Sequence, residues 1–215
     1  GAYWDTEVKE CQQIGVDGYP VYTRKVHTDL SYLTCAQKLL AATDVIYPQF
    51  ATHNAHTLAA IYHWAKQHQV DNYEFQCLHG MGETLYDQVV GAENLGKACR
   101  IYAPVGSHQT LLAYLVRRLL ENGANSSFVN QIVDEAVPLD RLVADPIETV
   151  RAQGGVPHPA IALPQQLYGQ ERKNSSGIDL SNESRLQQLG EMFVSMAQRQ
   201  WQAAPLIAGE LAAQP

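Results

Sequence analysis

Short apolar runs alternate along the first half of the chain with longer runs in which apolar residues recur at helical spacing. The apolar runs Val45–Ala51, Tyr73–Leu78 and Arg100–Val105 are typical of strands. Each precedes a helical pattern, and these patterns cover residues 54–67, about 83–90 and about 109–121. Repeated strand-then-helix units predict parallel strands, because a parallel pair needs a long crossover connection.

One further helical pattern, over Ser31–Ala42, precedes these units, and Thr28 or Asp29 can cap its start. Three complete units and a partial one amount to half of an eight-stranded barrel. The predicted fold class is therefore α/β, the C-terminal half of a (βα)8 TIM-type barrel. An open half of this kind would leave its sheet edges unpaired. The opening residues from Gly1 also read as the middle of a domain rather than its natural beginning.

Polar and glycine-rich segments follow the predicted strands. They are Thr52-His53-Asn54, residues 79–82 and residues 106–108. The chemistry of a βα barrel is carried at the carboxyl ends of its strands. We therefore expect ligand-binding groups at these three junctions.

The pattern changes from Ser126 onward. A short helix is predicted over Phe128–Ala136, and a new segment runs from Pro138 to about Pro146. Residues 154–177 are rich in Gly, Pro, Asn and Ser, which is typical of a linker or an extended docking segment. Helical periodicity returns over Leu180–Gln202. We predict a barrel domain over 1–153 and a linker region over 154–215.

Composition narrows the class of protein. The 215 residues carry a formal charge of −7, which argues against a free-standing nucleic-acid binder. The four cysteines are far apart and form no CxxC pair, which favours reduced thiols in a cytoplasmic protein. There is no signal peptide, and no stretch approaches the roughly 20 apolar residues of a membrane-spanning helix. The glycine fingerprints of dinucleotide and P-loop sites and the GxSxG nucleophile elbow are also missing.

Two adjacent arginines stand out on the helix predicted at 109–121. Arg117 and Arg118 lie three and four residues after Tyr114, and Glu121 lies four residues after Arg117, at the spacing of a helical ion pair. Paired guanidinium groups suit bidentate capture of a small carboxylate. A solvated basic patch with one ion pair explains the same spacing, and the residues alone leave both interpretations open.

Three weaker signals accompany the arginines. Tyr102 can stack on a ring-shaped ligand or serve as a core tyrosine. The Thr52-His53 pair can bind a cofactor phosphate or flavin at the start of a helix, although Asn54 can equally cap that helix. His53 and His56 are three residues apart, so a metal is conceivable, but no carboxylate joins them at ligand spacing. The basic cluster at residues 22–27 can hold a phosphate or form a solvated loop.

Several longer motifs together resemble one family, the proline dehydrogenase domain of bacterial proline utilization A. The resemblance covers residues 1 to about 169 and rests on motifs in the family's order, at residues 1–5, 19–25, 47–54, 74–82, 100–106 and 114–118. Residues 173–180 and the helix after them are similar to the segment that leads into the family's aldehyde dehydrogenase module. The resemblance implies a distorted βα barrel that binds FAD non-covalently and oxidises L-proline to Δ1-pyrroline-5-carboxylate. It also implies that electrons pass to a quinone at the inner-membrane surface, so that a cytoplasmic protein acts at the membrane periphery.

The resemblance carries roles onto individual positions. Arg117 and Arg118 are similar to the pair that grips the proline carboxylate, and Glu121 to a residue that supports this site. The remaining substrate-pocket matches are Tyr3, Leu78, Tyr102 and Tyr114. The flavin-contacting matches are Gly1, Ala2, Thr52 and His53, with Thr23 and Lys25 toward the phosphates or adenosine. Tyr114, Arg117 and Arg118 are the expected catalytic residues, and no metal is expected.

The resemblance also implies partners outside these residues. The first strands of the barrel, the aldehyde dehydrogenase catalytic cysteine and the DNA-binding module of some members are absent here, so nucleic acid would be bound only through that module. Residues 1–215 alone are therefore expected to be poorly folded and inactive. Two alternatives remain: a metal-dependent barrel hydrolase using His53, His56 and His79, and a non-catalytic fragment of a larger assembly.

Overall fold

The computed structural model describes residues 3–123, 131, 134, 136–204, 206–207 and 210–211. The chain divides into two compact units. One consists of Gly1–Lys9 and Tyr19–Ala162, and the other of Glu10–Gly18 and Leu163–Pro215. The domain boundary predicted between residues 153 and 154 stays a prediction.

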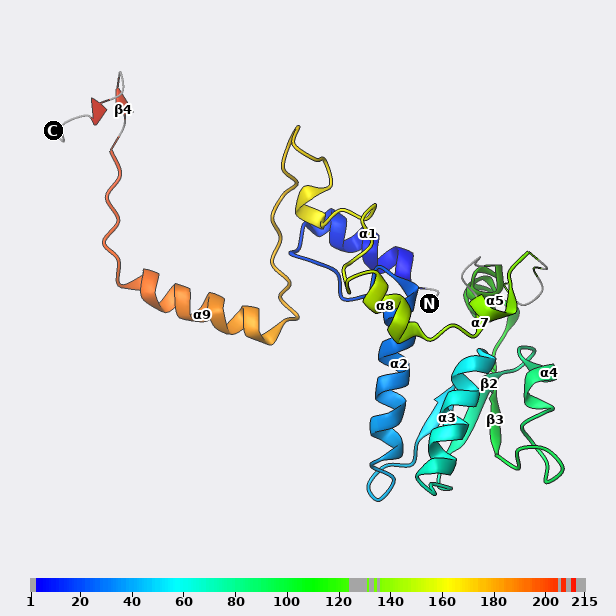
Figure 1. Ribbon diagram of the computed structural model, residues 1–215. Helices are drawn as coiled ribbons and strands as arrows, with labels where there is room; N and C mark the ends of the chain where they lie inside the picture. The colour runs from blue at the N-terminus through cyan, green and yellow to red at the C-terminus, as the bar shows by residue number, and fades with distance from the viewer. Residues whose placement is uncertain are drawn as a thin grey trace. The chain divides into compact units, whose positions relative to one another are not determined.

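Three parallel strands in the order β1-β2-β3 form the sheet of the first unit (Figure 1). They are β1 (Gln49–Ala51), β2 (Glu74–Leu78) and β3 (Cys99–Tyr102). Helix α3 (Ala55–Gln67) joins β1 to β2, and α4 (Glu83–Tyr86) lies between β2 and β3. The predicted alternation of strands and helices along the chain and the parallel pairing of the strands are confirmed.

Strand β1 is shorter than predicted at its start. The amides of Val45 and Ile46 both donate to Ala42 O, at 3.1 and 2.9 Å, in a turn that follows the preceding helix. Because a turn uses these donors, the apolar residues before Pro48 do not join the ladder.

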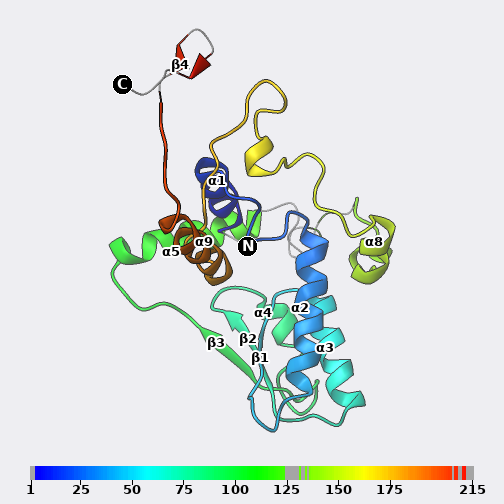
Figure 2. The ribbon, with the colours of Figure 1, turned by 90° about the vertical axis from the view of Figure 1, so that its left-hand side faces the viewer.

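The sheet has one apolar face, which α2 (Lys25–Leu40) and α3 cover (Figures 1 and 2). Alternation along the strands turns Phe50, Phe75 and Cys77 toward these helices. The rest of this core comes mainly from helical residues: Ala36, Leu40, Leu58, Ile61, Ala65, Tyr73, Tyr86 and Val89. Burial of this side of the sheet fixes the strand register, because a slip by one residue would turn the phenylalanines away from the helices.

The opposite face of the sheet is polar near the start of the strands. The buried Glu74 carboxylate accepts hydrogen bonds from Arg100 Nε and Nη2 at 2.6 and 3.0 Å, and from Gln49 Nε2 at 2.5 Å. Hydrogen bonds from Arg100, outweighing burial, hold the pKa of Glu74 at about 2. One carboxylate therefore ties all three strands together.

Helix α5 (His108–Gly123) lies beyond the carboxyl ends of the strands (Figures 1 and 2). Most of its leucines, which would ordinarily pack on a core, are exposed, and Leu119 is 72% exposed. Tyr114, Arg117 and Arg118 are half-buried instead. The helix therefore turns its basic and aromatic side inward.

The prediction for α2 was wrong at its start. The helix begins at Lys25, six residues before Ser31, and its N-cap Arg24 makes no side-chain cap hydrogen bond. Asp29 lies inside the helix and binds Lys25 Nζ at 2.6 Å, so it pairs across one turn and does not cap. By contrast, Asn54 caps α3, an interpretation that the sequence left open, by accepting from the amides of residues 56 and 57.

The segments after α5 contain short helices. They are α7 (Leu139–Leu142) and α8 (Pro146–Ala152), and Asp145 caps α8 through the amide of Ile147. Helix α8 contacts α2. Most of the helix predicted over 128–136 lies outside the described residues.

The second unit contains α9 (Glu183–Ala197), which is shorter at both ends than the predicted helix, and Asn182 caps it. Between residues 154 and 177 the regular element is one 3-10 turn, η1 (Pro164–Gln166). A short antiparallel pair, β4 (Leu206–Ile207) and β5 (Glu210–Leu211), was not predicted.

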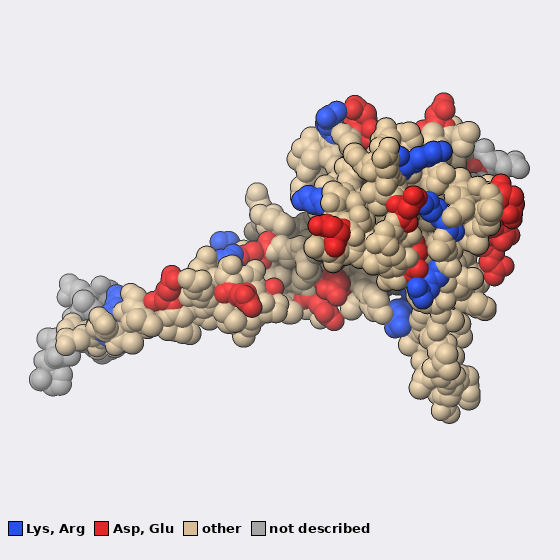
Figure 3. Space-filling view, turned by 90° about the horizontal axis from the view of Figure 1, so that it is seen from below, with Lys and Arg blue, Asp and Glu red and all other residues tan. Residues whose placement is uncertain are grey.

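The charged surface, the thiols and the apolar content of the helices add three observations. Basic and acidic side chains are interspersed on the face shown in Figure 3. The four cysteines are free, with Cys77 Sγ 3.6 Å from Cys99 Sγ. Within the described ranges, no helix is both long and apolar enough to cross a membrane.

Candidate functional site

The strand register brings two of the predicted pocket residues together. Leu78 and Tyr102 are the last residues of β2 and β3 and are direct partners in the ladder, so their side chains point to the same face of the sheet. Leu78 is buried, whereas Tyr102 is 42% exposed. Thr52 and His53 follow directly after β1, so all four residues lie at the carboxyl end of the sheet.

The two arginines of α5 both have aromatic companions. Arg117 Cζ lies 5.2 Å from the ring centre of Tyr3, and Arg118 Cζ lies 5.1 Å from that of Tyr114. Arg118 Nη1 also binds Glu121 Oε2 at 2.5 Å. The ion pair predicted from spacing joined Arg117 to Glu121, whereas the glutamate binds the neighbouring arginine at i, i+3.

Each of the two guanidinium groups has a buried Nε donor. The Nε atoms of Arg117 and Arg118 are shielded from solvent and have no hydrogen-bond partner among the described residues. The Arg118 side chain is only 22% exposed, unlike an arginine in a solvated patch. A buried donor without a partner is costly, so this pair suits an anion that supplies acceptors when it binds.

Electrostatic effects connect α5 to the strand ends. Burial lowers the pKa of His53, while Glu121 raises it and Arg118 lowers it further. Burial also raises the pKa of Tyr102, and the charges of Arg118 and Glu121 act on it as well. His53, Tyr102, Arg118 and Glu121 therefore belong to one group around the carboxyl ends of the strands.

Hydrogen bonds hold the segment after β1 in place. His53 Nε2 accepts from Leu78 N at 3.2 Å, and Thr52 Oγ1 accepts from Asn54 N at 3.1 Å. The Tyr86 hydroxyl donates to Thr52 O at 2.6 Å. The Thr52 hydroxyl can still donate its own proton, and the second ring nitrogen of His53 can still form a hydrogen bond.

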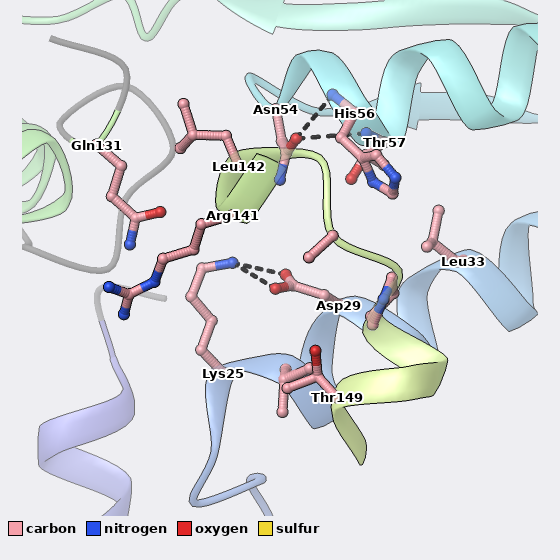
Figure 4. A pocket seen from close by; sticks show the side chains of 13 residues that line it. Lys25, Asp29, Leu33, Asn54, His56, Thr57, Gln131, Arg141, Leu142 and Thr149 are labelled. Carbon is pink, nitrogen blue, oxygen red and sulfur yellow. Dashed lines mark hydrogen bonds and ion pairs between the residues drawn. The ribbon is translucent and has the colours of Figure 1, made fainter. Parts of the chain in front are cut away.

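A pocket of about 180 Å³ lies beside the N-terminus of α3 (Figure 4). Lys25 and Arg141 bring two positive charges to it, and Asp29 pairs with Lys25 at 2.6 and 2.8 Å. Asn54, which also lines the pocket, accepts from the amides of His56 and Thr57 in the first turn of α3. Sequence reasoning missed Arg141, because nothing in the local pattern places it opposite α3.

The remaining predicted cofactor residues have different surroundings. Thr23 Oγ1 accepts from His158 N at 2.9 Å, and Thr23 is not part of the pocket lining. Gly1 and Ala2 lie outside the described residues.

The hydrolase alternative gains no support from this geometry. In the part of the chain that the structure describes, no three His, Cys, Asp or Glu side chains gather as a metal site would need. His53 Nε2 is already bound to a backbone amide. His56 lies instead at the pocket beside α3.

The strands are parallel and alternate with helices, and a basic and aromatic site lies at their carboxyl ends. This arrangement is typical of α/β proteins built from βα units. Comparison with known families makes this specific. The sequence profile of the proline dehydrogenase family matches residues 1–131, and the chain belongs to this family.

Named relatives agree with that assignment. The chain is 62% identical over 217 residues to "Bifunctional protein PutA" of Salmonella typhimurium and 60% identical over 223 residues to the protein of the same name from Escherichia coli. These matches cover 96% and 99% of this chain but only 16% and 17% of the relatives. The chain thus spans about a sixth of the curated relatives' length.

Solved structures give the same picture. A crystal structure of bifunctional proline utilization A (PutA) matches 96% of this chain and 20% of its own, with a TM-score of 0.82 and 49% identity. A mutant of Bradyrhizobium japonicum PutA matches 88% of this chain and 19% of its own, with a TM-score of 0.80 and 53% identity.

Proposed function

We propose that these residues form the substrate-binding part of a flavin-dependent proline dehydrogenase, which oxidises L-proline to Δ1-pyrroline-5-carboxylate and passes the electrons to a quinone. The observation that carries the proposal is the pair of buried Nε donors of Arg117 and Arg118 on α5, which have no hydrogen-bond partner in the described part of the chain. Family membership supplies the reaction class.

In this proposal the two guanidinium groups bind the proline carboxylate. Each offers N–H donors in a rigid fork that matches the geometry of a carboxylate. Glu121 holds Arg118 through its Nη1 and leaves the Nε donor for the substrate. Tyr3 and Tyr114 stack against the guanidinium groups and limit their movement.

Apolar and aromatic groups would then position the ring of proline. Leu78 and Tyr102 lie side by side in the strand register, at the end of the sheet beyond which α5 lies (Figure 2). Orienting a bound reactant in this way can lower a barrier by several kcal/mol, about 7 or more in the best models. These residues also exclude water from the reacting carbon.

FAD fits the groups that remain at this end of the unit. Thr52 and His53 offer hydrogen-bond donors after β1. Lys25 and Arg141 bring positive charge to the pocket near the start of α3, and although Asp29 offsets part of that charge, the remainder suits a phosphate group. Thr23 is placed near the phosphates or adenosine by resemblance. When bound, the flavin supplies the acceptor of the hydride from proline.

We further propose that the chain works inside a longer polypeptide, as the C-terminal half of a barrel whose remaining strands lie outside these residues. Among the residues that the structure describes, no strand pairs with the outer edges of β1 and β3, and several leucines of α5 are exposed. Both features support this view, because unpaired sheet edges and exposed apolar side chains are usually covered by other parts of a protein. Residues 1–153 would belong to the barrel and 154–215 would lead toward an aldehyde dehydrogenase module. The site would face a quinone at the inner-membrane surface from the cytoplasm.

The full-length protein tests the proposed function directly. Purified with FAD and mixed anaerobically with L-proline, it should lose the visible absorbance of oxidised flavin and release a cyclic imine. D-proline serves as the control and should reduce the flavin far more slowly, because the carboxylate and the ring cannot both be placed. A protein that binds no FAD, or a bound flavin that L-proline leaves oxidised, would contradict the proposal.

A further inference from the structure

A side chain replaces the backbone at the end of the β1–β2 ladder. Thr52 N donates to Gln76 O at 3.3 Å, and in a parallel ladder the next donor, Leu78 N, is then due at Thr52 O. Leu78 N donates instead to His53 Nε2, at 3.2 Å. The vacated Thr52 O accepts from the hydroxyl of Tyr86 at 2.6 Å.

This exchange fixes the protonation pattern of the imidazole. A ring nitrogen that accepts a hydrogen bond carries no proton, so the neutral ring of His53 is protonated on Nδ1. Burial lowers the pKa of His53 below its ordinary value, which keeps the ring uncharged near neutral pH. His53 is therefore a fixed donor through Nδ1.

The loop after β2 leaves room for this ring because Gly82 has no side chain. A Cβ at Gly82 would lie 3.1 Å from His53 Cδ2, closer than ordinary van der Waals contact, and 3.6 Å from Tyr86 Cδ2. Cδ2 is bonded to Nε2, the atom that accepts from Leu78 N. A side chain at Gly82 would thus press on the part of the ring that holds its hydrogen bond.

We propose that Gly82 is a positioning residue for His53. Because Gly82 has no side chain, the imidazole can pack against the loop after β2. There the hydrogen bond from Leu78 N selects the Nδ1–H tautomer, and Nδ1 is left to donate to an acceptor atom of the bound flavin. This inference rests on the proposed function, since it assigns the acceptor to the flavin. The contact between Gly82 and His53 is independent of any ligand.

A second glycine in the same loop provides a matched control. Gly80 has φ +78° and Gly82 has φ +69°, so alanine is strained by a left-handed backbone at both positions. A Cβ at Gly80 would meet no atom of the described residues within 4 Å. Comparing the Gly80→Ala and Gly82→Ala variants therefore separates backbone strain from pressure on His53.

The test is a double-mutant cycle in the full-length protein. FAD affinity is measured for the wild type, Gly82→Ala, His53→Ala, the double variant and Gly80→Ala. Gly82→Ala should weaken FAD binding about tenfold, the effect of one hydrogen bond, and Gly80→Ala by less than about twofold. In the His53→Ala background the Gly82→Ala change should cost less than about twofold, because the side chain it presses on is gone.

The melting temperatures of the FAD-free proteins give a second readout of the same cycle. Here too the extra destabilisation by Gly82→Ala over Gly80→Ala should vanish when His53 is alanine. If Gly82→Ala does not fold, restored folding in the double variant supports the inference. Equal losses in both backgrounds, or no rescue, would overturn it. Failure of L-proline to reduce the flavin would refute the proposed function and leave this coupling intact.

Discussion

Replacing Arg118 with methionine should weaken proline binding far more than it slows turnover. The Arg118 side chain is 22% exposed, and its buried Nε has no partner in the described residues. A hydrogen bond to a charged group contributes about 1.5–3 kcal/mol, so losing one should raise KM for proline by roughly 10- to 150-fold. Because a carboxylate is held equally in ground and transition states, kcat should change by less than about tenfold.

The control for this change is Arg151→Met on α8. Arg151 also pairs with a glutamate three residues away, Glu148, at 2.8 Å, but its side chain is 72% exposed. This variant should leave KM within about twofold of the wild type, because a solvated ion pair contributes little. Steady-state kinetics of the full-length enzyme over a range of proline concentrations measures both variants. An unchanged KM in Arg118→Met would refute the carboxylate role of Arg118.

Two further predictions concern the sheet and the outer side of α5. Glu74→Gln should lower the melting temperature by about 2–4 °C at neutral pH. The pKa of Glu74 is about 2 in the folded protein, below its ordinary value of 4.5. The stabilisation by the ionised carboxylate is therefore present above about pH 4.5 and is lost as the pH falls toward 2. The melting temperatures of the wild type and of Glu74→Gln should converge in acid. Leu119→Lys should also destabilise the full-length protein, by about 2 kcal/mol in urea unfolding, if that leucine is covered by the rest of the barrel. A change within 0.5 kcal/mol would show that it stays exposed.

Much of the fold could be predicted from local sequence patterns. The apolar stretch before Leu78 and the capped helix after Asn54 were predicted closely, because each follows from alternation or capping within a few residues. The start of α2 was not, since Asp29 can cap a helix or pair with Lys25 and only the folded chain decides between them. The turn at Ala42, which shortens β1, likewise has no strong sequence signal.

The candidate site was harder to predict from spacing. Adjacent arginines fit a solvated patch as well as a binding site. The binding site was favoured because the surrounding motifs resemble the proline dehydrogenase family. The orientation of α5 depends on tertiary packing, which turns Arg118 inward and leaves Leu119 exposed, against the usual rule for an amphipathic helix. Leu78 N donates to His53, and Arg141 and Lys25 line the same pocket. The residues of each pair are far apart in sequence, so no local pattern predicts either arrangement.

Two neighbouring guanidinium groups are expected to recognise a carboxylate, and comparing a carboxylate ligand with the corresponding amide tests this expectation. Apparent dissociation constants for L-proline and L-prolinamide can be obtained from the concentration dependence of anaerobic flavin reduction in the full-length protein. The wild type should prefer proline by about 30-fold or more, and the Arg117→Met/Arg118→Met variant should bind the two ligands almost equally. The same strong preference for the carboxylate in the double variant would contradict the account.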